Sequence, residues 1–427
     1  MTNSIDRRQF MQNTATTGAV ATTALSAAQA FSQESAANKL VVGVMGLSRG
    51  RSLAVGFAQM ADVEVKYVCD VDRDRAGSGA DLVAGANAPK PMVITDFRRI
   101  LEDKDVDILV CAAPNHWHAP ATIMGCNAGK HVYVEKPCSH NPFEGELMVA
   151  AARKNNRAVQ MGTQRRSAPE TILAIDELRG GAIGRVYHSR AFYASARPPI
   201  HPGTAPANVD FDLWQGPAPR LDEVRGYVHY NWHWRWHWGN GELGNNGVHT
   251  LDLCRWGMGV DYPLRVSSSG GRYHHVADSQ ETPDTQTVSF EFAGNRQITW
   301  TGLSCNRHRT DFVIFYGTGG TLELDSSGSY RIYDTKDALV KEVHGAALGD
   351  AQHKENFVTA IRMERPLSLN SEILEGHKST LLCHLGNIAQ RTGRLLNCDP
   401  TDGRILEDPE AMSLWARDYE PGWEPVV

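Results

Sequence analysis

Short apolar runs alternate with helix-like segments in the chain from Leu40 to Val134. Continuous apolar runs are typical of strands buried on both faces of a parallel sheet. Between them lie segments with helical character, such as Leu53–Met60. This alternation predicts a doubly wound α/β sheet of the Rossmann type, in which ligands bind beyond the carboxyl ends of the strands. The predicted strands are Leu40–Met45, Val63–Cys69, Asp107–Ala113 and His131–Val134.

After Gln160–Thr163 the pattern changes to β-rich runs. Val288, Phe290 and Phe292 alternate with polar residues, which is typical of a sheet with one buried face. The helical segment Glu372–Arg391 is expected to pack back near the first domain. We therefore predict a Rossmann domain over residues 39–161 and a second domain over residues 162–427. Its predicted strands are Arg185–Tyr193, Leu264–Ser267, Thr285–Phe292, Gln297–Leu303 and Asp311–Tyr316.

The first 30 residues are expected to be a targeting segment. Arg7 and Arg8 precede an uncharged Ala/Thr-rich run that ends in Ala28-Gln29-Ala30, which is similar to a twin-arginine export signal with its cleavage site. Asp6 stands where a serine or threonine is usual, and the alternative is a basic tail. The sequence thus predicts a protein exported by the twin-arginine route, for example to the periplasm.

Composition and charge argue against some classes of binding partner. The chain carries a net charge of −6 and has no basic run, which argues against a nucleic-acid-binding protein. After residue 30 no stretch approaches the ~18 apolar residues of a membrane span, so no membrane partner is predicted. The eight cysteines show neither metal-ligand spacing nor a disulfide framework.

A glycine turn follows the first predicted strand and precedes a helix-like segment. The turn reads Gly46-Leu47-Ser48-Arg49-Gly50-Arg51. Small residues here let the backbone approach a dinucleotide pyrophosphate, and a helix N-terminus supplies N–H groups and positive charge. Ser48 stands where the second glycine of the fingerprint is expected, and Arg51 where the third is expected.

The residue after the second predicted strand is Asp70. In a dinucleotide-binding domain an acid at this place accepts a hydrogen bond from a ribose 2′-hydroxyl, which favours NAD. Arg73 and Arg75 follow, and either of them can hold the 2′-phosphate of NADP instead.

Polar residues also follow the third and fourth predicted strands, in the segments 114–118 and 135–137. The carboxyl ends of parallel strands lie at one edge of a sheet, so these residues are expected to cluster with Asp70. Lys136 at a strand end can hydrogen-bond a reacting hydroxyl and stabilise an alkoxide. The candidate cofactor residues are Gly46, Ser48, Arg49, Asp70, Pro114, Asn115, His116, His118, Glu135 and Lys136.

The segments AAPNHWH at 112–118, VYVEKP at 132–137 and GVHTLD at 247–252 resemble the Gfo/Idh/MocA family of oxidoreductases. The resemblance extends to the segments at 211–219, 317–324, 354–362 and 384–394. It implies a Rossmann domain followed by a C-terminal α+β domain with an open, mostly antiparallel sheet that often mediates homo-oligomers. It also implies hydride transfer between a nicotinamide cofactor and a sugar or cyclitol. By this resemblance Lys136 and His249 match the active-site lysine and histidine.

One position departs from the family pattern. An aspartate commonly precedes the histidine by four residues, whereas this chain has Asn245. Asparagine can orient a hydroxyl but cannot accept its proton, so the general base is His249 or Lys136. The imidazole of His249 is expected to titrate near neutrality without a special pKa shift. Asp252 either compensates electrostatically or caps the helix that starts near Val248.

The aromatic segment that precedes this helix reads YNWHWRWHW, with four tryptophans at every second position from Trp232 to Trp238. A strand here would place the four indoles on one side and His233, Arg235 and His237 on the other. Indole faces stack on sugar rings, although some of these rings can instead be core or interface anchors. The candidate substrate residues are Trp232, Trp234, His233, Arg235, His237, Asn245 and Asp252.

The spacing of His229, His233 and His237 admits a metal site. Arg235 lies between two of these histidines on the same strand face and no carboxylate is nearby, so no metal is predicted.

Export and a nicotinamide cofactor together require that the cofactor is tightly bound, because NAD does not circulate freely outside the cytoplasm. The leading hypothesis is an exported sugar oxidoreductase with tightly bound NAD, or NADP. The alternatives are an NAD-dependent redox-cycle glycosidase or lyase and a non-catalytic sugar-binding member of the family. The last is suggested by Ser48 and Asn245.

Overall fold

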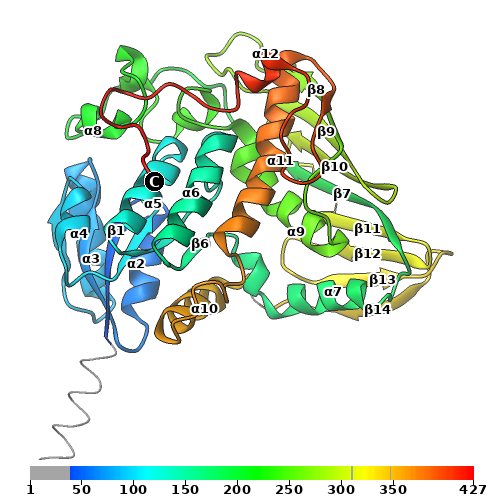
Figure 1. Ribbon diagram of the computed structural model, residues 1–427, viewed down its shortest axis with the longest axis horizontal. Coiled ribbons are helices and arrows are strands. Elements are labelled where there is room, and N and C mark those ends of the chain that lie inside the picture. Colours follow the sequence, from blue (N-terminus) through cyan, green and yellow to red (C-terminus); the bar gives the residue numbers. More distant parts are fainter. Residues whose placement is uncertain (1–38, 309–310, 347) are drawn as a thin grey trace, which may run out of the picture.

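The computed structural model describes residues 39–308, 311–346 and 348–427. The predicted export signal at residues 1–30 lies outside the described residues. Figure 1 shows two sheets side by side, with helices between them that include the long helix α11, Ile373–Thr392. Within the described part of the chain no helix combines the length and the apolar content that a bilayer crossing requires.

The described part of the first domain is built on a parallel sheet with the strand order β3-β2-β1-β4-β5-β6. The order reverses between β1 and β4, and a crevice forms at such a switch point beyond the strand ends. The predicted Rossmann sheet is confirmed, with β6 ending at Met161. The strands are β1 Leu40–Met45, β2 Val63–Cys69, β3 Met92–Ile94, β4 Ile108–Cys111, β5 His131–Val134 and β6 Val159–Met161.

Helices cover both faces of this sheet, which explains why its strands are continuously apolar. In β4, Ile108 and Val110 belong to the apolar cluster on one face, while Leu109 and Cys111 belong to the cluster on the other. The connecting helices are α2 Gly50–Ala58, α3 Arg73–Gly85, α4 Arg98–Glu102, α5 Asn115–Asn127 and α6 Pro142–Lys154, and α10, Asp350–Arg362, joins α2 and α3 on their face.

The second sheet is mixed and mostly antiparallel, with the order β14-β13-β12-β11-β7-β10-β9-β8-β15 among the described strands. Its one parallel pair among these strands is β7 with β10. In β9, Val288, Phe290 and Phe292 are buried, as the alternation predicts. The strands are β7 Val186–Ala194, β8 Arg265–Gly271, β9 Thr285–Phe292, β10 Arg296–Leu303, β11 Val313–Gly317, β12 Gly320–Leu324, β13 Tyr330–Tyr333, β14 Leu339–Val343 and β15 Leu396–Asn397.

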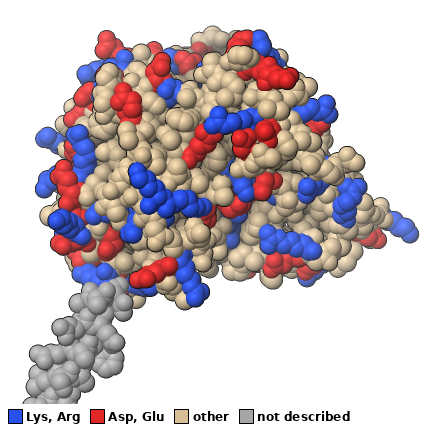
Figure 2. All heavy atoms as spheres, in the orientation of Figure 1, with Lys and Arg blue, Asp and Glu red and all other residues tan. Residues whose placement is uncertain are grey.

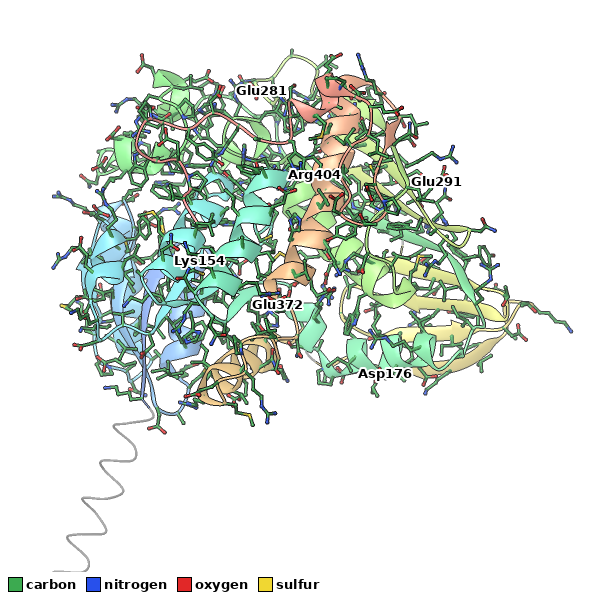
Figure 3. The ribbon with its side chains drawn as sticks, in the orientation of Figure 1. Lys154, Asp176, Glu281, Glu291, Glu372 and Arg404 are labelled. Atoms are coloured by element: carbon green, nitrogen blue, oxygen red, sulfur yellow. The ribbon has the colours of Figure 1, made fainter. Side chains whose placement is uncertain are left out.

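The helix predicted over Glu372–Arg391 is α11, and it contacts α6 of the first domain and β8 of the second. Glu372 caps its N-terminus by accepting a hydrogen bond from the Leu374 N–H (3.0 Å) and also pairs with Arg153 of α6 (2.7 Å). Figure 3 labels Glu372 at this junction. The remaining helices are η1 Gln164–Ser167, α7 Pro169–Arg179, α8 Phe211–Gln215, η2 Asp222–Gly226, η3 Asn231–Trp234, η4 Leu243–Gly247, α9 Val248–Met258 and α12 Pro409–Met412.

The tryptophan run is not a strand, so the prediction of two alternating faces is wrong. Asn231–Trp234 is a short 3-10 helix, and the N–H groups of Arg235 and Trp238 bond the carbonyls of Trp232 and Arg235. These local bonds satisfy backbone groups that a strand would offer to a neighbour. Trp234 and Trp238 are fully buried in an apolar cluster with Trp214 and Tyr227.

A buried ion pair holds α9 in place. The Arg166 guanidinium in η1 donates to both carboxylate oxygens of Asp252 in α9, each at 2.9 Å. The Ser379 hydroxyl of α11 donates to the same carboxylate (2.7 Å). Arg166 and Asp252 are 4% and 1% exposed. Asp252 therefore joins three elements and does not line the cavity at the strand ends, which corrects its prediction as a substrate-binding residue.

Replacing Asp252 with alanine is expected to lower the free energy of unfolding by about 3–5 kcal/mol, because the buried Arg166 guanidinium loses its counterion. Denaturant unfolding monitored by tryptophan fluorescence measures the change. The double variant Asp252→Ala/Arg166→Met is expected to recover part of the loss, since no unpaired charge remains. Equal stability of Asp252→Ala and the unchanged protein would contradict the assignment.

Candidate active site

A cavity of about 350 Å³ lies beyond the carboxyl ends of β1, β2, β4 and β5 and is closed by the aromatic segment that precedes α9. Its walls come from both domains. The predicted site residues that line it are Gly46, Ser48, Arg49, Asp70, Pro114, Asn115, His118, Glu135, Lys136, Trp232, His233, Asn245 and His249.

One end of the cavity has the features that a dinucleotide requires. Gly46 adopts a φ of +85°, and a Cβ there would lie 2.5 Å from the Ala112 carbonyl oxygen, so the turn needs glycine. The Asp70 carboxylate accepts hydrogen bonds from the N–H of Leu47 (2.7 Å) and of Asp72 (3.0 Å). Burial raises the pKa of Asp70. These bonds fix a carboxylate beside the glycine turn, where a ribose hydroxyl can donate to it.

The two arginines that follow Asp70 differ in position. Arg75 lines the cavity, whereas Arg73 lies on a separate surface hollow beside Asp74 and Asp81. Of the two arginines considered as partners for a 2′-phosphate, Arg75 is therefore the one that lies beside Asp70.

The Arg49 side chain is held by two carboxylates. Its Nε lies 3.2 Å from Glu135 Oε1, and its Nη2 pairs with Asp350 of α10. The guanidinium is thus held by two carboxylates of the protein. A phosphate can instead approach the backbone N–H groups of the turn that contains Arg49.

Lys136, at the end of β5, bonds the second domain directly. Its Nζ donates to the Asn245 carbonyl oxygen (2.7 Å) and to Asn245 Oδ1 (3.1 Å). Burial lowers the pKa of Lys136, while the charges of Glu135 and Glu242 oppose the shift. Asn245 lies in η4, a π-helical turn, and such turns frequently occur at functional sites.

His249 lies in the first turn of α9 and faces the same cavity. Its Nδ1 is buried and has no hydrogen-bond partner among the described residues. Burial lowers the pKa of His249 well below its ordinary value, and the positive charge of Lys136 adds to the shift. The expectation of an unshifted pKa is therefore not supported, because the surroundings of this partly exposed imidazole and the nearby cations lower its pKa.

Only part of the aromatic segment reaches the cavity. The Trp232 indole and the His233 imidazole stack with their centroids 3.6 Å apart, and both line it. His233 Nδ1 bonds the Tyr230 carbonyl oxygen (2.6 Å), and burial lowers the pKa of His233 to about 3. His233 is consequently neutral and part of a wall of stacked rings.

His118 supports the floor of the cavity. Its Nδ1 faces the Pro137 carbonyl oxygen (2.6 Å) and its Nε2 faces that of Ala113 (2.7 Å). The imidazole therefore ties together the segments that follow β4 and β5. The Asn115 side-chain amide donates a hydrogen bond to Oδ1 of Asn240 (3.0 Å), a residue that follows the tryptophan run.

Five predicted site residues lie outside this cavity, Asp252 among them. His116 is fully buried with its Nε2 on the Trp214 carbonyl oxygen (2.8 Å), so it is part of the packed scaffold beside the cavity. Arg235 pairs with Glu223 and Glu281, and His237 bonds the Pro219 carbonyl oxygen (2.8 Å). The other is Trp234, which lies in the apolar cluster.

The three histidines weighed as metal ligands have separate partners. His229 Nε2 pairs with Asp72 (2.9 Å), while His233 and His237 each bond a backbone carbonyl.

A second cavity of about 380 Å³ adjoins the first, because Gln164 and His249 line both. Its other polar residues include Arg165, Tyr193 and Asn246. Sequence reasoning found His249 but missed Gln164, Arg165, Tyr193 and Asn246. Gln164 and Arg165 follow β6 in the way that Lys136 follows β5. The strand-end rule applied to β6 would have found Gln164 and Arg165.

Comparison with known proteins agrees with this architecture. The sequence model described as "Oxidoreductase family, NAD-binding Rossmann fold" matches residues 37–163. The model described as "Oxidoreductase family, C-terminal alpha/beta domain" matches residues 185–424, more than half of the chain.

Similar solved structures include a levoglucosan dehydrogenase in complex with NADH and levoglucosan, with a TM-score of 0.67 and 18% identity over 84% of this chain and 99% of that chain. An aldose-aldose oxidoreductase from Caulobacter crescentus, complexed with glycerol, has a TM-score of 0.65 and 20% identity over the same shares. At these identities the likeness shows the fold.

Curated relatives include a glycosyl hydrolase family 109 protein of Shewanella baltica, 29% identical over 212 residues. That match covers 45% of this chain and 46% of the relative, so the chain spans less than half of the relative's length. An alpha-N-acetylgalactosaminidase of Shewanella oneidensis is 28% identical over 36% of this chain and 34% of that protein. By its two family matches and its fold, the chain belongs to the Gfo/Idh/MocA oxidoreductase family, with an NAD-binding Rossmann domain followed by the family's C-terminal alpha/beta domain.

Proposed function

We propose that this protein is an exported oxidoreductase that transfers hydride between tightly bound NAD and a carbon of a sugar, a cyclitol or a sugar derivative. The observation that carries the proposal is the contact of Lys136 Nζ with Asn245, in the cavity that also contains Asp70 and His249. A proton donor (Lys136), a neutral imidazole (His249) and an acceptor for a ribose hydroxyl (Asp70) thus line one cavity.

The residues at the glycine turn fit NAD. The turn from Gly46 to Arg49 would hold the pyrophosphate, and Asp70 would accept from the adenosine ribose. NAD supplies a nicotinamide carbon that takes up and returns a hydride. Because Arg75 lies beside Asp70, NADP stays an alternative until the nucleotide is identified.

Lys136 is the proposed donor to the reacting oxygen. An ammonium group has three N–H donors, and two of them bond Asn245. The third is available to a substrate oxygen. Because burial lowers the pKa of Lys136, its ammonium gives up a proton more readily than an exposed lysine does. In this role it stabilises the negative charge that develops on the oxygen as the hydroxyl proton leaves, before hydride departs from the neighbouring carbon and the carbonyl forms.

His249 is the proposed general base. Its lowered pKa keeps the imidazole neutral, so one ring nitrogen carries a lone pair that can accept the hydroxyl proton. Asn245 cannot take this part. Its amide oxygen instead orients the Lys136 ammonium, which makes Asn245 a positioning residue for the donor.

The two adjoining cavities suit a polyhydroxylated substrate that contacts residues of both. Trp232 and His233 offer a stacked aromatic wall on one side of His249, and Arg165, Tyr193 and Asn246 offer polar groups on the other. Sugars need both kinds of surface, because their C–H faces pack on rings and their hydroxyls bond polar groups.

A redox-cycle glycosidase or lyase is the second candidate. The names of the curated relatives favour it, and the cavity beyond His249 leaves room for a group attached to the reacting sugar. In this scheme the hydride is returned to the product, so the nucleotide undergoes no net change. Net oxidation instead requires a second substrate or an added acceptor.

Export remains a proposal that rests on Arg7, Arg8 and Ala28-Gln29-Ala30. The homo-oligomer expected from the open sheet also remains a prediction.

Replacing Lys136 with methionine is expected to lower kcat about 1000-fold, because the oxygen loses its proton donor. Aldoses and levoglucosan with an electron acceptor test oxidation, and 4-nitrophenyl N-acetyl-α-galactosaminide tests cleavage. Lys154→Met, at an exposed lysine labelled in Figure 3, is the control and should turn over normally. Nucleotide content is measured in each sample to separate lost cofactor from lost chemistry. Unchanged turnover by Lys136→Met would remove Lys136 from the mechanism.

The pH dependence of kcat is expected to show no acid limb near 6.5, the ordinary pKa of histidine. A lowered pKa means that His249 stays unprotonated, and so active as a base, as the pH falls through that value. His249→Asn should lower kcat about 100-fold at every pH tested. An acid limb with a midpoint near 6.5 that disappears in His249→Asn would contradict a buried, neutral His249.

Protein collected from the periplasm of the expression host is expected to lack residues 1–30 and to contain close to one nucleotide per chain. Mass spectrometry of the intact chain and of the nucleotide released by denaturation measures both quantities. The Arg7→Lys/Arg8→Lys variant should stay in the cytoplasm with the same nucleotide. A periplasmic protein without nucleotide would overturn the tightly bound cofactor, and export of the double-lysine variant would overturn the twin-arginine route.

A further inference from the structure

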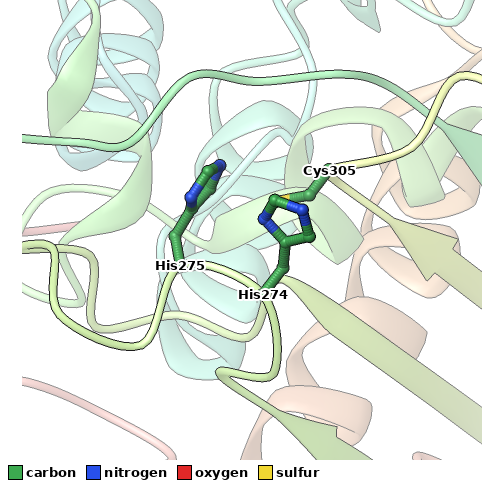
Figure 4. Close-up of side chains that lie close together, drawn as sticks. All are labelled: His274, His275 and Cys305. Atoms are coloured by element: carbon green, nitrogen blue, oxygen red, sulfur yellow. The ribbon is translucent and has the colours of Figure 1, made fainter.

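His274, His275 and Cys305 bring two imidazoles and a thiol together at a place away from both cavities. One ligand atom from each residue lies within 4.8 Å of the others. The histidines belong to the loop between β8 and β9, and the cysteine follows β10. Figure 4 shows both imidazoles on one loop, with Cys305 arriving from the other segment.

One buried carboxylate holds both parts of this cluster. The Asp284 side chain accepts hydrogen bonds from the backbone N–H of His274 (3.0 Å) and of His275 (3.2 Å). Its own carbonyl oxygen accepts from the N–H of Ser304 (2.8 Å), the residue before Cys305. Asp284 is 1% exposed. The backbone segments that carry the three side chains are therefore held together by one buried residue.

Two acids, Asp284 and Asp278, and two arginines, Arg272 and Arg197, lie near the Cys305 thiol. Burial, together with the negative charges of Asp284 and Asp278, raises the pKa of Cys305 to about 11. The Arg272 guanidinium is engaged by Asp278 and by the carbonyls of His275 and Gln280. Metal ions bind the thiolate form of cysteine, so binding of an ion here would release the thiol proton.

We propose that His274, His275 and Cys305 form a zinc site that joins the β8–β9 loop to the segment after β10. Two imidazoles and a thiolate are ligands that Zn²⁺ prefers, whereas Ca²⁺ and Mg²⁺ prefer oxygen. His275 Nε2 lies 3.2 Å from the Arg197 carbonyl oxygen. When Nε2 donates this bond, Nδ1 carries the lone pair, which is the arrangement common for metal-binding histidines.

The geometry requires a small closure. Zinc bonds of about 2.0 Å to nitrogen and 2.3 Å to sulfur place tetrahedral ligand atoms roughly 3.3–3.5 Å apart. The separations therefore shorten by on the order of 1 Å when the ion binds. His274 is exposed, so water supplies the fourth ligand. The site is a clip between two segments of the second domain, and the inference does not rest on the function proposed above.

Alkylation of the unaltered full chain tests the site directly. Cys305 is partly exposed, whereas the other seven cysteines, all within the described residues, are buried. Iodoacetamide should therefore label Cys305 first in chelator-treated protein, and one equivalent of Zn²⁺ should slow that labelling about tenfold or more, as peptide mass spectrometry shows. Labelling of Cys305 at the same rate with and without Zn²⁺ would overturn the proposal. Equal amounts of Mg²⁺ should give no protection.

Ligand variants provide the second test. Chelator-treated protein is mixed with Zn²⁺ and passed through a desalting column, and bound zinc is measured by elemental mass spectrometry. The unaltered chain should retain close to one equivalent, and Cys305→Ser and His274→Ala should each weaken zinc binding about 100-fold. His344→Ala, at an exposed histidine on another loop, is the matched control. Retention of zinc by Cys305→Ser equal to that of the control would overturn the assignment of the ligands.

Discussion

The position of α9 depends on one desolvated ion pair, Arg166 with Asp252. Both groups are buried, so each needs the other, and Ser379 fixes the same carboxylate from α11. His249 lies three residues before Asp252 on the same helix and so has its position set by this pair. Stability and site geometry are therefore coupled, because weakening the pair frees the helix that presents the imidazole.

The substitution of asparagine at position 245 has an electrostatic consequence. Asn245 Oδ1 lies 3.1 Å from Lys136 Nζ, and an aspartate in its place would put a negative charge there. That charge would favour the ammonium and compete with an oxyanion for it. Asn245 orients the ammonium without neutralising it. The same net positive charge helps to keep His249 neutral, so one substitution favours both the donor and the base.

The strands and the cavity at their ends could be predicted because both follow from local pattern. β4 is apolar on both faces, and Lys136 and Asp70 come directly after strands. The errors have local and distant causes. The alternation of the tryptophans imitates a strand, but local turns take up its backbone groups, and Asp252 meets a guanidinium 86 residues away. The lowered pKa of His249 likewise depends on burial that no local pattern contains.

The distribution of charge on the surface of this protein gives little guidance to its candidate sites. On the face in Figure 2, lysines and arginines are interspersed with acids. The candidate active site and the proposed zinc site instead depend on buried partners such as Asp252 and Asp284. From His275 a continuous set of contacts runs through the Arg197 carbonyl, the Arg197–Glu242 ion pair and Asn246, which lines the second cavity. The β8–β9 loop therefore supports a wall of the second cavity, and the proposed metal clip would stabilise that wall from outside the cavity.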